Sequence, residues 1–120
     1  MIDFEKFLND RINNNKNLEN LSSFFTTDEL SQLSDKAISI VGTNAKTSTA
    51  NYIYQVLSEL GIKTLIFTSP HLISYEERIQ SNQHEINHSQ YIEEIKEFEE
   101  KKSINLGYFE TLFLIACKTF

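Results

Sequence analysis

Two short runs of continuously apolar residues stand out in the hydrophobic pattern of this chain. Residues 37–41 and 63–67 are rich in β-branched or aromatic side chains and too short for buried helices, so both are predicted to form strands. Between them, apolar positions at helical spacing predict a helix over residues 48–60, which Gly61 can end in the left-handed conformation. Strands that are apolar on both faces and joined through a helix are typical of an α/β fold, a parallel sheet with flanking helices.

Four further helices are predicted outside this unit. Asp3 can cap the first, in which Ile2 and Phe7 occupy the positions of a hydrophobic staple, and Thr26 and Glu29 form a capping box for the second. The third is strongly charged, whereas the fourth is apolar almost all round and is therefore expected in the core. In chain order the four helices cover residues 2–8, 27–34, 89–102 and 108–120, with an asparagine-rich loop over 13–20 and a loop with a short strand over 72–88.

Some single residues have an expected environment but match no motif. His84 and His88 are expected at the surface. Cys117 is expected to be a buried small hydrophobe rather than a nucleophile. The aromatic residues expected in the core are Tyr108, Phe109, Phe113 and Phe120.

The composition excludes several classes of protein. The chain has 120 residues, a formal charge of −6 and 40% hydrophobic residues, which suits a packed core rather than wholesale disorder. A pI near 5.0 argues against a nucleic-acid surface, and no apolar run is long enough to span a membrane. One cysteine cannot form an internal disulfide, and the acidic N-terminal segment is unlike a signal peptide. We therefore expect a cytoplasmic protein that binds neither nucleic acid nor membranes.

The segment between the first predicted strand and its helix has the chemistry of an anion site. Residues 42–49 read Gly-Thr-Asn-Ala-Lys-Thr-Ser-Thr. The first amides of a helix lack intrahelical partners, and the helix dipole favours negative charge there. Lys46 adds a full positive charge, and the three hydroxyl residues after it suit phosphate oxygens or Mg²⁺. The full Walker pattern is absent, since Ile40 and Ala45 replace its glycines, and an ordinary strand-to-helix turn is the alternative.

Three motifs resemble one family in order and spacing. Residues 42–48 resemble the Gly-Thr-Asn-Gly-Lys loop of the Mur ligase family, ATP-dependent enzymes that join a carboxylate to an amino acid. The second motif is Phe-Thr-Ser-Pro-His-Leu at 67–72 followed by Glu-Arg-Ile at 77–79, and the third is Gly-Tyr-Phe-Glu-Thr at 107–111. Both resemble segments of its folylpolyglutamate synthase and dihydrofolate synthase branch. The resemblance implies an enzyme that uses ATP to add L-glutamate to dihydropteroate or folate through an acyl phosphate. Residues 1–120 would then be the N-terminal part of a larger P-loop-type ATP-binding domain, with exposed edge and core surface, in a monomer.

The resemblance also implies a role for each matching residue. Lys46 is implied as the catalytic cation, and Ser69 and Glu110 as ligands of Mg²⁺. On local grounds alone, Glu110 can instead complement a helix N-terminus, and Ser69 can belong to a simple turn. The implied ATP phosphate-binding residues are Gly42, Thr43, Asn44, Ala45, Lys46, Thr47 and Ser48, and the implied residues of a pterin-side substrate loop are Pro70, His71, Leu72 and Arg78.

Two residues depart from the family pattern, Ala45 in place of a loop glycine and Gly107 in place of a threonine. In addition, Thr47 stands where the folate branch has a glycine, as in the cell-wall branch of the family. If position 45 needs a positive φ, alanine is strained there. Two other functions stay open: a nucleotide-binding fragment without catalysis, and another P-loop phosphotransferase such as a small kinase. With only two arginines, Arg11 and Arg78, the chain lacks the arginine-rich lid expected of such a kinase.

Overall fold

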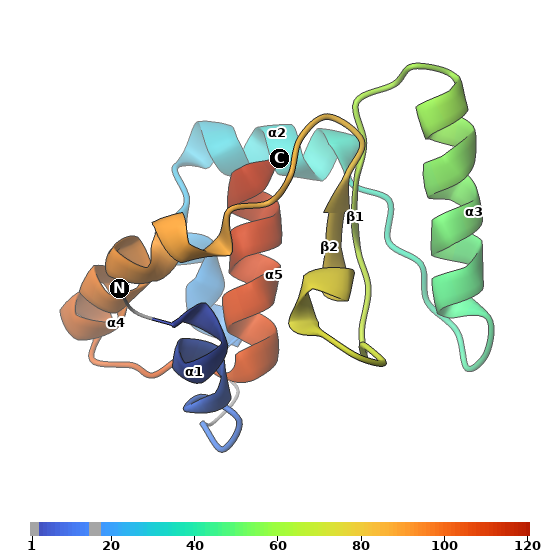
Figure 1. Ribbon diagram of the computed structural model, residues 1–120. Coiled ribbons are helices and arrows are strands. Elements are labelled where there is room, and N and C mark those ends of the chain that lie inside the picture. Colours follow the sequence, from blue (N-terminus) through green and yellow to red (C-terminus); the bar gives the residue numbers. More distant parts are fainter. Residues whose placement is uncertain (1–2, 15–17) are drawn as a thin grey trace. The chain divides into compact units, whose positions relative to one another are not determined.

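The computed structural model describes residues 3–14 and 18–120, which form two compact units (Figure 1). Ile2, predicted to form a hydrophobic staple with Phe7, lies outside the described residues. We call the two units the helical unit and the hairpin unit. The helical unit comprises the chain up to Lys36 and Asn87–Lys118, and the hairpin unit comprises Ala37–Ile86 and Thr119–Phe120.

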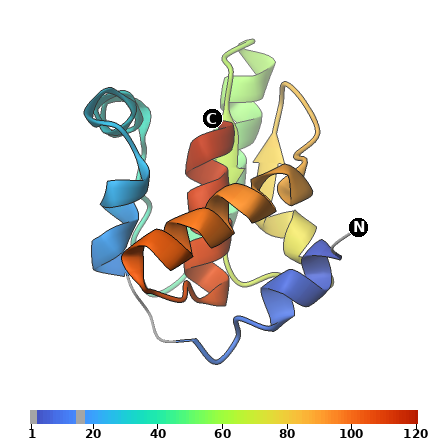
Figure 2. The same cartoon turned by 90° about the vertical axis from the view of Figure 1, so that its left-hand side faces the viewer.

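The helical unit is built around α5 (Tyr108–Thr119), and α4 (Ile92–Lys102) lies across it (Figure 2). α4 buries the face that carries Ile92, Ile95 and Phe98, as its apolar spacing predicts. α5 is apolar around most of its circumference and buries most of it. The fully buried apolar side chains of the unit are Leu8, Ile95, Leu106, Leu112, Leu114 and Ile115.

The two shorter helices of this unit start at caps that the sequence predicts. α1 (Phe4–Asn9) follows Asp3, whose Oδ1 accepts the backbone N–H of the second helical residue at 3.0 Å. α2 (Thr27–Lys36) begins with a capping box, in which the Thr26 hydroxyl accepts the Glu29 amide and the Glu29 carboxylate accepts the Thr26 amide. These side chains satisfy donors that a helix start leaves unpaired. Two 3-10 segments complete the unit, η1 (Leu18–Phe24) and η3 (His88–Tyr91).

Two groups of charged side chains connect the helices of this unit. The Arg11 guanidinium, just after α1, forms a 2.5 Å ion pair with Glu99 of α4. On α5, the Lys118 ammonium lies 3.3 Å from Glu29 of α2 and 3.5 Å from Glu94 of α4. The first pair is nearly buried, so losing one partner leaves the other charge poorly solvated. The second group is more exposed and contributes less to stability.

The hairpin unit holds the paired strands of the described residues. β1 (Leu65–Phe67) pairs antiparallel with β2 (Ile79–Ser81), with Phe67 opposite Ile79. α3 (Lys46–Glu59) precedes β1, and the short 3-10 segment η2 (Tyr75–Arg78) leads into β2. Gly61 has a φ of 72°, which confirms the predicted left-handed end of the helix.

Asn82 joins the end of α3 to the hairpin. Its Oδ1 accepts the backbone N–H of Thr64 at 2.9 Å. Its Nδ2 donates to the backbone carbonyl of Ile62 at 2.7 Å and to the hydroxyl of Ser58 at 3.1 Å. One polar side chain thus adds three hydrogen bonds to the backbone bonds of the turn between α3 and β1, such as those from Gly61 to Ser58 and from Ile62 to Leu57.

The prediction of a strand over residues 37–41 is wrong for this structure. The segment runs without strand pairing, and Ile38 and Val41 are 66% and 88% exposed. A strand needs a neighbour for its backbone groups, and within the described residues β1 pairs only with β2, which comes later in the chain. The parallel sheet is therefore not confirmed. α3 accordingly buries no residue fully, and Leu60, predicted on its inner face, is exposed.

The predicted environments of several single residues need correction. His88 is buried rather than exposed, and its ring lies 5.2 Å from that of Phe4. Phe109 and Phe113 lie on the exposed side of α5, where their rings stack on each other instead of entering the core. Cys117, Tyr108 and Phe120, all predicted in the interior, are only half-buried, and partial burial raises the pKa of the Cys117 thiol. No helix of the described residues is long and apolar enough to cross a membrane.

Replacing Glu99 with alanine should destabilise the helical unit. The Arg11 guanidinium would stay buried without its carboxylate partner, and we expect the free energy of unfolding to fall by about 3 kcal/mol. Urea denaturation measures this change. Glu100→Ala, which removes an exposed carboxylate from the same helix, is the control and should change stability by less than about 0.5 kcal/mol. Equal unfolding midpoints for the two variants would contradict the importance of the pair.

Candidate functional site

The predicted phosphate loop is exposed at the start of α3. All residues from Gly42 to Ser48 are exposed, and the helix begins at Lys46. The first helical hydrogen bond runs from the Thr49 amide to the Ala45 carbonyl, and Ala45 provides no side chain to cap the earlier amides. The amides of the first turn therefore lack a helical partner, and a 14-residue helix adds its dipole to them. This arrangement suits an anion.

The backbone turns sharply at two residues of this loop. Gly42 has a φ of 151°, and Ala45 has a φ of 61° and ψ of 15°. The first is a conformation that glycine adopts without penalty. The second is the left-handed region, where the alanine Cβ crowds the backbone at a cost of about 1–2 kcal/mol. The strain expected from Ala45 is thus present, and it lies directly before the amides that would bind phosphate.

The Lys46 side chain folds back over the loop. Its ammonium donates a hydrogen bond to the Gly42 carbonyl at 2.6 Å. The positive charge of Lys46 therefore lies close to the loop that precedes the first amides of α3. Because the side chain is exposed, it can exchange the Gly42 carbonyl for another partner. A lysine in this place can neutralise a phosphate group that enters the loop.

The predicted substrate loop follows the end of β1. Ser69 is exposed and precedes Pro70 in a cis peptide bond. His71 and Arg78, both implied as substrate residues, are brought together: the Arg78 Nε donates to the His71 Nδ1 at 2.8 Å. Leu72 is 94% exposed. The structure thus gathers these predicted residues on one loop of the hairpin unit, beside the paired strands.

Glu77, which begins the Glu-Arg-Ile motif but had no predicted role, organises this loop. Its carboxylate accepts three consecutive backbone amides, those of Leu72 at 3.1 Å, Ile73 at 2.7 Å and Ser74 at 2.8 Å. These three hydrogen bonds hold the pKa of Glu77 below its ordinary value, and the bond from the Ser74 amide has the largest effect. The pattern Ser74-x-x-Glu77 is a capping box in the structure and could have been recognised in the sequence.

Glu110, the other predicted metal ligand, is buried in the first turn of α5. Among the described residues, its Oε1 has no hydrogen-bond partner. The carboxylate folds back against Gly107, so that a Cβ on Gly107 would overlap the Glu110 Oε2. A buried carboxylate oxygen without a donor fits the hard oxygen ligands that Mg²⁺ prefers. Ser69 belongs to the hairpin unit and Glu110 to the helical unit, so neither unit contains the pair.

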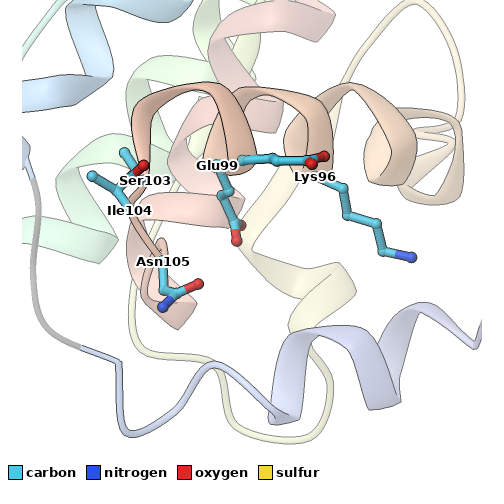
Figure 3. Close-up of a pocket in the computed structure, with 6 residues that line it drawn as sticks. Lys96, Glu99, Ser103, Ile104 and Asn105 are labelled. Carbon is cyan, nitrogen blue, oxygen red and sulfur yellow. The ribbon is translucent and has the colours of Figure 1, made fainter.

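Among residues 3–14 and 18–120, neither a cluster of potential metal ligands nor the pocket at the end of α4 coincides with the predicted site residues. Within the described part of the chain, no group of three or more histidine, cysteine or acidic side chains could hold a metal. An open pocket of about 410 Å³ lies at the C-terminal end of α4, and none of the predicted site residues lines it. Figure 3 shows its position. Its lining residues are Lys96, Glu99, Glu100, Ser103, Ile104 and Asn105.

Comparison with known proteins places the chain among ligases. It is 34% identical over 100 residues to the dihydrofolate synthase/folylpolyglutamate synthase of Buchnera aphidicola, covering 82% of this chain and 21% of that protein. The corresponding protein of Escherichia coli is 33% identical over 72 residues, or 59% of this chain and 17% of the relative. The chain thus spans about a fifth of the length of the curated relatives it matches. No family model matches the chain.

A solved structure shows the same relationship. The Mycobacterium tuberculosis folylpolyglutamate synthase complexed with ADP has a TM-score of 0.68 and 29% sequence identity, and the match covers 98% of this chain and 28% of that one. Sequence and fold therefore relate this chain to a class of ligase enzymes. In particular, it is a homologue of the dihydrofolate/folylpolyglutamate synthases, which confirms the resemblance indicated by its three motifs.

Replacing Ala45 with glycine should stabilise the hairpin unit. Glycine adopts a φ of 61° without steric cost, so we expect the free energy of unfolding to rise by about 1 kcal/mol. The control is Ala50→Gly in the interior of α3, which should lower stability by about 1 kcal/mol because glycine there costs backbone entropy. Thermal unfolding compares the two variants. Destabilisation by both would show that position 45 is not strained.

Replacing Gly107 with alanine should displace the Glu110 carboxylate. The methyl group needs the space that the Glu110 Oε2 occupies, so we expect a loss of about 1–3 kcal/mol in the free energy of unfolding. In a Glu110→Ala background that space is empty, and the same substitution should cost almost nothing. A double-mutant cycle measures the difference. Additive effects of the two substitutions would contradict the contact.

Proposed function

We propose that this chain is the ATP-binding portion of a ligase that adds L-glutamate to dihydropteroate or folate. The observation that carries the proposal is the loop from Gly42 to Ser48, which combines unpaired helix amides with a lysine at the start of α3. A homologous synthase has been solved complexed with ADP, which supports nucleotide binding by this chain. The relatives' names support folate and glutamate as the substrate classes.

In the proposed reaction, the loop binds the phosphates of ATP. The substrate carboxylate attacks the γ-phosphorus, the bond to the β-phosphate oxygen breaks, and ADP leaves. The glutamate amine then attacks the acyl carbon of the acyl phosphate and loses a proton as inorganic phosphate departs. Lys46 would exchange its hydrogen bond to Gly42 for the phosphate and stabilise the charge on the transferred group, while Thr47 and Ser48 offer hydroxyls to phosphate oxygens.

Ser69 and Glu110 are proposed as ligands of Mg²⁺. The exposed Ser69 hydroxyl and the buried Glu110 Oε1 are hard oxygen donors, and neither has to give up a salt bridge in the described residues to bind a cation. When bound, Mg²⁺ would act as a Lewis acid toward the phosphate oxygens.

Pro70, His71, Leu72 and Arg78 are proposed to contact the pterin side of the substrate. The Arg78–His71 hydrogen bond gives this loop a fixed polar edge, and Leu72 gives it an exposed apolar side chain.

We also propose that residues 37–41 become a strand of a parallel sheet in the complete ATP-binding domain. The exposed β-branched side chains Ile38 and Val41 support this pairing.

The acidic composition and the single cysteine support a cytoplasmic protein that binds neither nucleic acid nor membranes, and we propose that it acts as a monomer.

Lys46→Ala should weaken nucleotide binding. Removing a charge-assisted phosphate contact is expected to lower the affinity for ATP, in the presence of Mg²⁺, by at least about tenfold, which calorimetric titration can measure. The matched control is Lys101→Ala at the exposed C-terminal end of α4, which should bind ATP as the wild type does. Unchanged affinity in the Lys46 variant would overturn the phosphate-loop assignment.

The full-length wild-type protein should cleave ATP only when two substrates are present together: L-glutamate, and either dihydropteroate or folate. Binding of ATP without such turnover in the full-length protein would favour a non-catalytic nucleotide-binding protein. ATP cleavage with another phosphate acceptor would favour a different P-loop phosphotransferase.

A further inference from the structure

The loop before β2 depends on one carboxylate for its conformation. Leu72 and Ile73 are 94% and 91% exposed, so packing into the core cannot fix them. The polar bonds behind them do: the amides of both residues and of Ser74 all point at the Glu77 carboxylate. Consecutive amides that converge on one anion form a rigid turn, because no water has to complete their hydrogen bonds.

Two further contacts hold the ends of this loop. The Thr68 amide donates to the Arg78 carbonyl at 2.8 Å, continuing the pairing of the hairpin beyond β1. The Arg78 side chain reaches back to His71. The base of the loop is therefore held by the hairpin, and its tip by Glu77. The aliphatic side chains of Leu72 and Ile73 lie at the tip and are exposed over most of their surface.

We propose that Glu77 is a positioning residue for substrate recognition: its carboxylate holds Leu72 and Ile73 in the conformation that contacts the flat ring system of the folate-type substrate. This inference rests on the proposed function. Exposed aliphatic side chains gain free energy when a flat apolar ring covers them, and a preformed loop avoids the entropy of ordering at binding. Glu77 itself faces the backbone and does not touch the ligand.

The test compares Glu77→Ala and Glu77→Gln with the control Glu76→Ala in the full-length protein. Glu76 is the exposed neighbour, and its carboxylate makes none of the three amide bonds. If loss of Glu77 leaves the loop correctly formed for about one tenth of the time, the KM for the folate-type substrate should rise about tenfold. The kcat and the KM for ATP should stay as in the wild type.

The glutamine variant should show a smaller rise. The bonds from Ile73 and Ser74 both reach Oε1, which an amide oxygen can replace, whereas the bond from Leu72 reaches Oε2. Hydrogen exchange at these three amides should become faster in Glu77→Ala but not in Glu76→Ala. Glu76→Ala should leave both KM values unchanged.

The outcomes separate the two proposals. A wild-type protein without folate-dependent turnover overturns the proposed function, and the role of Glu77 with it. Normal wild-type turnover, combined with an unchanged KM for the folate-type substrate in Glu77→Ala, overturns only the positioning role, even if the three amides exchange faster. A fall in kcat together with similar rises in both KM values would mean that Glu77 supports the fold in general. This result would also overturn the positioning role.

Discussion

Backbone N–H groups outside regular pairing need partners, and the kind of partner that each loop supplies governs what the loop can do. At the start of α2 the partner is Glu29, and in the loop before β2 it is Glu77, so both turns are closed by the chain's own carboxylates. At the start of α3 the chain offers no such side chain, because Ala45 stands at the cap. An anion from outside is then the natural partner for these amides.

Features fixed by neighbours in sequence could be predicted, and those fixed by distant neighbours could not. The caps at Asp3 and Thr26 and the left-handed Gly61 each depend on a few adjacent residues, and all three are present. The strand over residues 37–41 fails because β-branched composition cannot supply a partner strand. For the same reason a local pattern cannot reveal that β1 pairs with β2, twelve residues further on.

In the candidate site too, local sequence predicts some features and distant packing determines others. Its residue types follow from three short motifs, but their environments depend on packing. The motif around Glu110 indicates a carboxylate at the start of a helix, yet not that the carboxylate is buried and folded against Gly107. That position arises because residue 107 has no side chain, which links one departure from the family pattern to the geometry of a proposed metal ligand.

The other departure, Ala45, acts on the backbone instead of on a side chain. A left-handed alanine costs stability, and the loop keeps it because the residues on both sides, the turn at Gly42 and the helix beginning at Lys46, require the chain to change direction there. The same turn sets the orientation of the amides in the first turn of α3. The strain and the proposed anion site therefore share one cause, since the conformation that destabilises the free loop is the one that leaves the amides of the first turn without a helical partner.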